Sequence, residues 1–135
     1  MSRQAPSRIV AIGVGCRAGV GGEAIAALVR RALEEAGAPE GERRIYTLDA
    51  KAAEPGLIET ARIIGVSLTP LPLAALAAQA ERVLTPSAPA QKRFGVANIA
   101  EAAALAGAGD NGRLLGPRLA ADGATCAVAV SPERP

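Results

Sequence analysis

Residues 9–22 read IVAIGVGCRAGVGG, a short apolar run that passes directly into a glycine-rich segment. The first four residues fit a strand buried on both faces, and the segment from Gly13 to Gly22 predicts a loop after it. Apolar side chains then recur at helical spacing from Glu23 to Ala36, and Gly37 is a natural stop. A strand, a glycine loop and an amphipathic helix in this order indicate an α/β fold.

The same alternation continues through the middle of the chain. A second strand is predicted at Ile45–Leu48 and a third at Val66–Leu68. A short helix opened by Pro55 and closed by Gly65 separates them, and another helix is expected from Pro72 to Ala80. The order βαβαβα implies that the strands are at least partly parallel and that helices cover the faces of the sheet.

The C-terminal third has a different pattern. Residues 85–97 are rich in turn-forming residues and predict a loop, after which Asn98 starts a helix with Glu101 placed as in a capping box. Two runs, Arg113–Leu119 and Ala124–Val130, flank an Asp-Gly turn and predict a hairpin. The predicted fold class is therefore α/β: a single domain with a mixed, mostly parallel sheet flanked by helices and a C-terminal β-hairpin.

Length and hydropathy bear on the organisation and location of the chain. With 135 residues, half of them apolar, the chain is able to bury one core. We therefore expect one domain at residues 9–131 after a disordered lead-in at residues 1–8. No uncharged apolar run approaches the roughly 18 residues of a membrane span, and the first strand is too short for a signal sequence. We expect a cytoplasmic protein without a membrane partner.

The composition excludes several kinds of chemistry. The chain has no histidine, which rules out a Ser-His-Asp triad, a Cys-His pair, a histidine base and a His-ligated metal. Its two cysteines, Cys16 and Cys126, lie far apart in sequence and form neither a zinc motif nor a disulfide framework. We expect no metal and no cofactor.

Arginine dominates the positive charge, because Lys51 and Lys92 are the only lysines among fifteen cationic residues. This excess either serves to grip carboxylate or phosphate groups or reflects a GC-rich genome. The arginines are scattered, and Tyr46 and Phe94 are the only aromatic residues. A nucleic acid is therefore not an expected partner.

Two loops, Gly13–Gly22 and Asp49–Glu54, follow predicted strands at the edge where ligands gather in an open α/β sheet. The first matches the G-x-G-x-x-A variant of the dinucleotide fingerprint. Its helix starts only after Gly22, and Asp49 lies well beyond the spacing of about 20 residues expected for a ribose-binding acid. The pattern therefore disfavours dinucleotide binding.

Each side chain near these loops has two interpretations. Cys16 stands beside Arg17 and near a helix N-terminus, which favours a reactive thiolate, or it is a small residue tucked into a tight turn. Asp49, Lys51 and Glu54 supply acid, base and charge to a substrate, or they belong to a solvated loop. The residues alone leave both pairs of alternatives open.

Three residues further along the chain have a similar ambiguity. Thr85 and Ser87 either donate hydrogen bonds to a ligand or serve turns and helix caps. Arg118 precedes the final hairpin and is either a ligand-binding cation or a surface charge. Their spacing does not decide between these roles.

Several motifs, taken together, resemble the CobE and CbiG C-terminal domain family of cobalamin-biosynthesis proteins. The resemblance extends from Ile9 to Val130 and covers nearly the whole chain. The matching segments are residues 12–19, 47–57, 85–87, 95–103 and 123–129. A series of separate motifs in the right order is far more specific than a single glycine loop.

The resemblance implies a role in building the corrin ring of vitamin B12. It implies a protein that acts on or binds a precorrin or other corrinoid intermediate as an accessory or carrier domain, with other enzymes of the pathway as further partners. Full-length CbiG opens a ring lactone of a cobalt-precorrin and releases acetaldehyde, so a hydrolase of a precorrin-5-type lactone is one alternative. The matching segments correspond to its C-terminal domain alone. A non-catalytic subunit of a pathway assembly is the other alternative, so the question of catalysis stays open.

Together with the two loops, the resemblance predicts one cleft. Corrinoid precursors are large polycarboxylates, and Arg17, Lys51 and Arg118 are candidates to pair with their peripheral carboxylates. The candidate substrate-binding residues are Gly13, Gly15, Cys16, Arg17, Gly19, Thr85, Ser87 and Arg118. The candidate catalytic residues are Asp49, Lys51 and Glu54, with Asp49 or Glu54 as general base and Lys51 or Arg17 stabilising negative charge.

Overall fold

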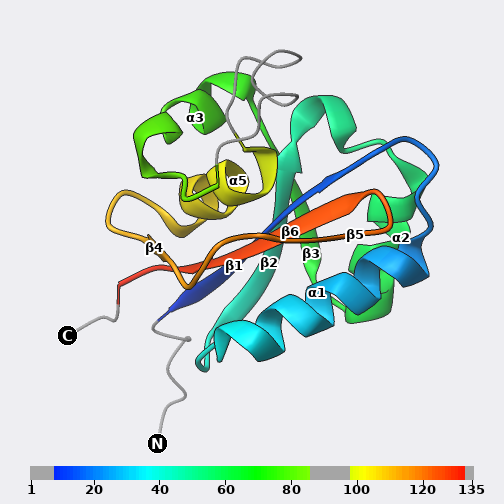
Figure 1. Cartoon of the computed structure of the whole chain (residues 1–135), viewed down its shortest axis with the longest axis horizontal. Coiled ribbons are helices and arrows are strands. Elements are labelled where there is room, and N and C mark those ends of the chain that lie inside the picture. The colour runs from blue at the N-terminus through cyan, green and yellow to red at the C-terminus, as the bar shows by residue number, and fades with distance from the viewer. Residues whose placement is uncertain (1–7, 86–97, 133–135) are drawn as a thin grey trace, which may run out of the picture.

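The computed structural model describes residues 8–85 and 98–132, whose strands form a single sheet (Figure 1). The six strands are β1 (Ile9–Cys16), β2 (Glu42–Leu48), β3 (Ser67–Leu71), β4 (Arg113–Leu114), β5 (Leu119–Ala121) and β6 (Ala124–Val130). Their order is β3-β2-β1-β6-β4, and β5 also pairs with β6. Residues 1–7 of the expected lead-in and residues 86–97 of the predicted loop lie outside the described residues.

Helices cover both faces of the sheet (Figure 1). The helices α1 (Gly22–Ala36) and α2 (Pro55–Ile64) lie on one face, and α3 (Leu73–Ala77) and α5 (Ile99–Ala108) lie on the other. Two 3-10 turns, η1 (Asp49–Lys51) and η2 (Ala80–Arg82), follow β2 and α3. Within residues 8–85 and 98–132, no helix is long and apolar enough to cross a membrane.

The predicted α/β fold with a mixed sheet is confirmed. The strands β1, β2 and β3 are parallel, and α1 and α2 connect them in the expected βαβαβ order. The last strand, β6, runs antiparallel to β1 and pairs in the same sense with β4 and β5. The parallel character therefore holds for the first three strands, and the C-terminal strands are antiparallel.

The predicted C-terminal hairpin is present as β5 and β6. Asp122 and Gly123 connect these strands with φ angles of 53° and 86°. Two successive residues in the left-handed region are what a two-residue hairpin turn of the favoured type requires, and Asp-Gly is a preferred pair for it. This turn lies at the same edge of the sheet as the end of β1, because Cys16 is opposite Ala124.

Several predicted elements differ in extent. The first strand does not end at Gly13, because β1 stays paired with β6 as far as Cys16, so the predicted loop Gly13–Gly22 is shorter than expected. The strands β2 and β3 are also longer than predicted. The run Arg113–Leu119 is divided into β4 and β5, because Gly116 and Pro117 stand between them and Pro117 has no N–H to donate to a ladder. The helix expected from Pro72 to Ala80 is the short helix α3 followed by the turn η2.

The two faces of the sheet have cores of different texture. The face under α1 and α2 is packed with branched side chains such as Ile12, Val14 and Val128. The face under α5 is packed mainly with alanine, namely Ala11, Ala100, Ala102, Ala103, Ala104, Ala108, Ala127 and Ala129. Because alanine is small, α5 lies close to the central strands β1 and β6.

Gly13 sets how closely α5 approaches β1. A methyl group on Gly13 would overlap the carbonyl oxygen of Ala100 and lie 2.6 Å from the backbone nitrogen of Ala104. The backbone of α5 therefore rests on β1 with no side chain of Gly13 between them. This contact places the N-terminus of α5 beside the carboxyl end of β1.

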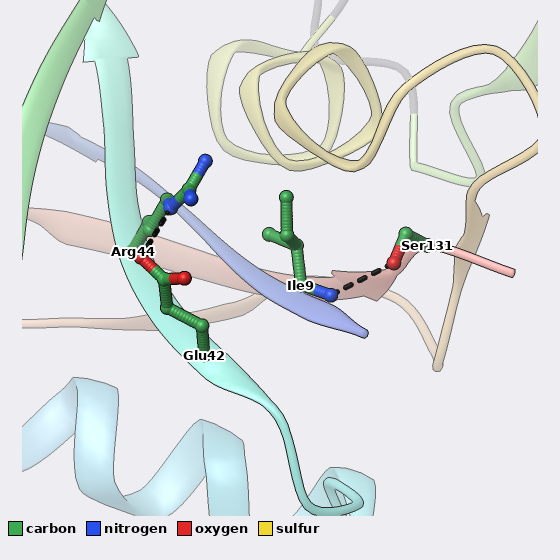
Figure 2. Close-up of polar contacts among 4 residues, drawn as sticks. All are labelled: Ile9, Glu42, Arg44 and Ser131. Carbon is green, nitrogen blue, oxygen red and sulfur yellow. Dashed lines mark hydrogen bonds and ion pairs between the residues drawn. The ribbon is translucent and has the colours of Figure 1, made fainter. Parts of the chain in front are cut away.

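The opposite end of the sheet is closed by polar contacts between the first and last strands (Figure 2). The N–H of Ile9 donates to Ser131 Oγ at 2.8 Å, and the N–H of Ser131 donates to the carbonyl of Ile9 at 3.0 Å. On the neighbouring strand β2, Arg44 Nε donates to a carboxylate oxygen of Glu42 at 2.9 Å, and this hydrogen bond lowers the pKa of Glu42. The pair lies at the surface, where such pairs add little stability.

We predict that Gly13→Ala destabilises the fold by about 3 kcal/mol, because the added methyl group forces α5 away from β1. Gly21→Ala is the matched control, since a methyl group at Gly21 meets nothing within 4 Å and its φ of −73° suits any residue. We expect the control to lose less than about 1 kcal/mol. Urea unfolding followed by circular dichroism measures both, and equal losses would contradict the close contact between α5 and β1.

Candidate functional site

The candidate site forms where β1 and β2 separate. Parallel pairing between these strands ends at Gly13, whereas β1 stays paired with β6 as far as Cys16. The buried hydroxyl of Thr47 donates to the carbonyl of Val14 at 2.8 Å. At this point a side-chain hydrogen bond takes the place of the backbone pairing between β1 and β2. The last residues of β1 consequently border the opening between the two strands.

A pocket of about 450 Å³ lies at this edge, within the range of about 300–1,000 Å³ typical of small-molecule sites. We call it the strand-end pocket. It is bounded by the end of β1, the residues that follow β2, the N-terminus of α5 and the β5–β6 hairpin. Its lining residues are Gly15, Cys16, Arg17, Leu48, Lys51, Asn98, Ile99, Arg118, Ala120, Ala121, Asp122, Gly123, Ala124 and Thr125.

Positive charge predominates around this pocket. Arg17, Lys51 and Arg118 line it, against the single carboxylate of Asp122. Within the described part of the chain, none of these three cations forms an ion pair with a carboxylate. The aliphatic side chains of Leu48 and Ile99 also line the pocket, and we call this surface its apolar wall. The arrangement suits a ligand with an apolar body and several anionic groups.

Five of the residues singled out in the sequence line this pocket: Gly15, Cys16, Arg17, Lys51 and Arg118. They come from three separate segments of the chain, so the fold brings together positions up to about a hundred residues apart. The N–H of Arg17 also donates to the carbonyl of Gly123 at 2.9 Å, which ties the glycine loop to the hairpin turn.

The other candidates lie elsewhere. Gly13 is buried against α5, and Asp49 is exposed on η1 without lining the pocket. Glu54 accepts a long hydrogen bond of 3.4 Å from the N–H of Gly19, so these two residues hold the glycine loop rather than face the pocket.

Thr85 serves a neighbouring network. Its hydroxyl donates to Glu101 Oε2 at 2.8 Å, and its carbonyl accepts from Asn98 Nδ2 at 2.6 Å. Ser87 lies outside the described residues. Thr85 therefore helps to hold together the segments that surround the pocket.

The thiol of Cys16 is not activated as its sequence neighbours suggest. Burial and the negative charge of Glu54 raise its pKa, and the positive charge of Lys51 only partly opposes them. Cys16 is the last residue of β1 and stands before the start of α1 by several residues. Of the two interpretations left open by the sequence, the raised pKa therefore favours a small residue at the end of the strand over a reactive thiolate. Cys126, fully buried in β6, has its pKa raised to about 12 by burial alone.

Glu101 is the important side chain that sequence analysis misinterpreted. It is fully buried. Its Oε1 accepts the N–H groups of Leu84 at 2.6 Å and Thr85 at 2.9 Å, and its Oε2 accepts the Thr85 hydroxyl at 2.8 Å and the N–H of Arg118 at 2.8 Å. One carboxylate thus joins α5 to two other segments, one of which carries a cation of the pocket.

The capping-box prediction is half correct. Asn98 does cap α5, because its Oδ1 accepts the N–H of Glu101 at 2.9 Å. The carboxylate of Glu101, which would return to the Asn98 N–H in a capping box, bonds instead to the segments beside α5. A carboxylate within an otherwise alanine-rich helix was the available signal for this role.

Comparison with known proteins identifies the family. The family model described as "Cobalamin synthesis G C-terminus" matches residues 10–129. The chain belongs to this family of cobalamin-biosynthesis proteins. It is 35% identical over 119 residues to Protein CobE of Sinorhizobium sp, a match that covers 87% of this chain and 77% of the relative.

Solved structures of the same family share this fold. The crystal structure of CobE, a protein from the cobalamin (vitamin B12) biosynthetic pathway, superposes with a TM-score of 0.87 at 34% identity, over 98% of this chain and 97% of the other. The cobalamin biosynthesis protein chiG of Agrobacterium tumefaciens str. C58 gives 0.67 at 32% identity, over 90% and 98%. The resemblance drawn from the sequence motifs is confirmed.

No group of three or more Cys, Asp or Glu side chains in residues 8–85 and 98–132 is placed to hold a metal ion. The strand-end pocket of this member of the CbiG C-terminal family is lined by three cations and by the aliphatic side chains of its apolar wall.

The reactivity of the two cysteines tests the burial and the pKa of Cys16, which lines the pocket. We predict that iodoacetamide at pH 8 modifies Cys16 more slowly than a free cysteine, because its raised pKa reduces the thiolate fraction, and that the rate climbs as the pH rises above 9. Cys126 should react only in denaturant. Mass spectrometry of tryptic peptides distinguishes the two sites. Rapid labelling of Cys16 at pH 7 would contradict the raised pKa.

Proposed function

We propose that this chain binds a precorrin or other corrinoid intermediate in the strand-end pocket and serves cobalamin biosynthesis as an accessory or carrier domain. The observation that supports this most is the group of three cations, Arg17, Lys51 and Arg118, around a pocket with a single carboxylate. Corrinoid precursors carry several carboxylates on an apolar ring. Guanidinium and ammonium groups bind such carboxylates through charge-assisted hydrogen bonds.

The apolar wall of the pocket supports the same ligand class. Leu48, Ile99 and the alanines of the β5–β6 hairpin supply aliphatic surface without aromatic rings. An apolar macrocycle edge gains from leaving water at such a surface, while its peripheral carboxylates reach the cations.

The placement of the acidic candidates favours binding over lactone hydrolysis. Asp49 and Glu54, the expected general bases, do not line the pocket, and Cys16 has a raised pKa. A general base must lie within hydrogen-bond reach of the proton that it removes. Lys51 remains in place to hold a carboxylate, so its proposed role is ligand binding.

We predict that a corrinoid with free side-chain carboxylates binds this protein, and that Arg17→Ala and Lys51→Ala each weaken binding by about twofold to tenfold, as expected for partly exposed ion pairs. Arg62→Ala is the matched control, since it removes the same charge from an exposed site on α2. Titration followed by the visible absorption of the corrinoid measures the affinity, and raising the salt concentration should weaken binding because it screens these charges.

A corrinoid whose carboxylates are converted to amides gives the complementary measurement. It keeps the ring and its shape but loses the negative charges, so we expect it to bind at least tenfold more weakly. Equal affinity for both forms, or an equal loss in Arg62→Ala, would show that the cations of the pocket do not hold the ligand. Absence of any binding would reject the carrier function and leave the role of an assembly subunit.

A further inference from the structure

The three cations of the strand-end pocket are not equivalent. Arg17 is exposed, and its contacts are made by the backbone: its N–H donates to the carbonyl of Gly123 at 2.9 Å, and its carbonyl accepts from the N–H of Val20 at 3.5 Å. Within the described residues, its guanidinium forms no hydrogen bond. Arg118 is held at two points, because its N–H donates to Glu101 Oε2 at 2.8 Å and its guanidinium Nη1 donates to the carbonyl of Thr85 at 3.5 Å. Both of its anchors belong to the network around Glu101.

We propose that Glu101 is a positioning residue that fixes Arg118 at the pocket, and that Arg118 is consequently the cation that distinguishes a carboxylate from an amide. The second part rests on the function proposed above, whereas the first concerns this chain alone. Glu101 touches no ligand in this proposal and acts only through Arg118.

The physical argument starts from the geometry of guanidinium. Its planar set of N–H donors matches the two oxygens of a carboxylate, and an amide presents donors of its own to the same group. A fixed guanidinium loses little freedom on binding, so it discriminates by geometry. An exposed cation without such an anchor, such as Arg17, contributes mainly attraction at a distance.

The substitution Glu101→Gln isolates this role. The amide oxygen is best placed toward Leu84 and Thr85, where it accepts two N–H groups as Oε1 does now. The amide nitrogen then takes the place of Oε2, where the Thr85 hydroxyl is able to rotate and accept, but the N–H of Arg118 meets another donor. The shape and most contacts are kept, and the shorter of the two anchors of Arg118 is lost.

The first experiment requires no ligand. Phenylglyoxal modifies exposed and mobile arginines, and peptide mass spectrometry reports the rates at Arg118 and Arg17 in the same sample. We expect the Arg118-to-Arg17 rate ratio to rise at least threefold in Glu101→Gln. Glu35→Gln, which neutralises the exposed partner of Arg31 on α1, is the matched control and should leave the ratio unchanged.

The second experiment is a double-mutant cycle on corrinoid affinity. We expect Glu101→Gln to weaken binding of the carboxylate form by about tenfold and of the amide form by less than twofold. In an Arg118→Ala background the same substitution should have less than a twofold effect, because Glu101 acts through Arg118. A residue that merely stabilised the fold would weaken binding equally in both backgrounds.

An unchanged phenylglyoxal ratio in folded Glu101→Gln overturns the positioning role, and additive losses in the cycle overturn the link to specificity. If the wild type binds no corrinoid, the proposed function fails while the arginine reactivity still decides the role of Glu101. If Glu101→Gln does not fold, hydrogen exchange of the backbone amide of Arg118 in the wild type tests the positioning role instead. Strong protection of this amide supports the proposal, and exchange at the rate of a free amide rejects the proposal.

Discussion

The close contact between α5 and β1 is the constraint on which the site depends. Gly13 has no side chain, so the backbone of α5 at Ala100 and Ala104 rests directly on the first strand. This contact brings the N-terminus of α5 next to the point where β1 and β2 separate. Asn98 and Ile99 then become a wall of the strand-end pocket, and the first turn of α5 faces the segment that carries Arg118. A larger residue at position 13 would therefore displace α5 and change the shape of the strand-end pocket.

The site also depends on the buried carboxylate of Glu101, which α5 carries. Burying a carboxyl group costs free energy unless its oxygens find hydrogen-bond donors. Four donors meet it, three backbone N–H groups and one hydroxyl, all within 2.6–2.9 Å. Each backbone donor belongs to a segment outside the helices and strands. The side chain of Glu101 therefore holds segments that have no strand partners in the sheet. These hydrogen bonds explain why a glutamate is present in an otherwise alanine-rich core.

The sequence predicted the parts that local patterns determine. Helical periodicity located α1, Pro55 and Gly65 bounded α2, and the Asp-Gly pair located the final turn. The edge of the sheet where the pocket lies followed from strand polarity. The partners of Glu101 were beyond prediction, because they lie sixteen or seventeen positions away and depend on how three segments pack. The two interpretations of Cys16 could not be separated from the sequence for a related reason, since its burial, which raises the pKa, depends on packing.

The same carboxylates explain how a chain with nearly balanced charge has a cationic pocket. Thirteen acidic residues oppose fifteen basic ones overall, yet three cations and one carboxylate line the strand-end pocket. Glu101 and Glu54, whose contacts reach the segments around the pocket, accept backbone N–H groups instead of lining it. Within the described residues, neither carboxylate forms an ion pair with Arg17, Lys51 or Arg118. The donors of Arg17, Lys51 and Arg118 consequently stay available to an anionic ligand, and the fold gives this pocket its charge by directing acids to the scaffold.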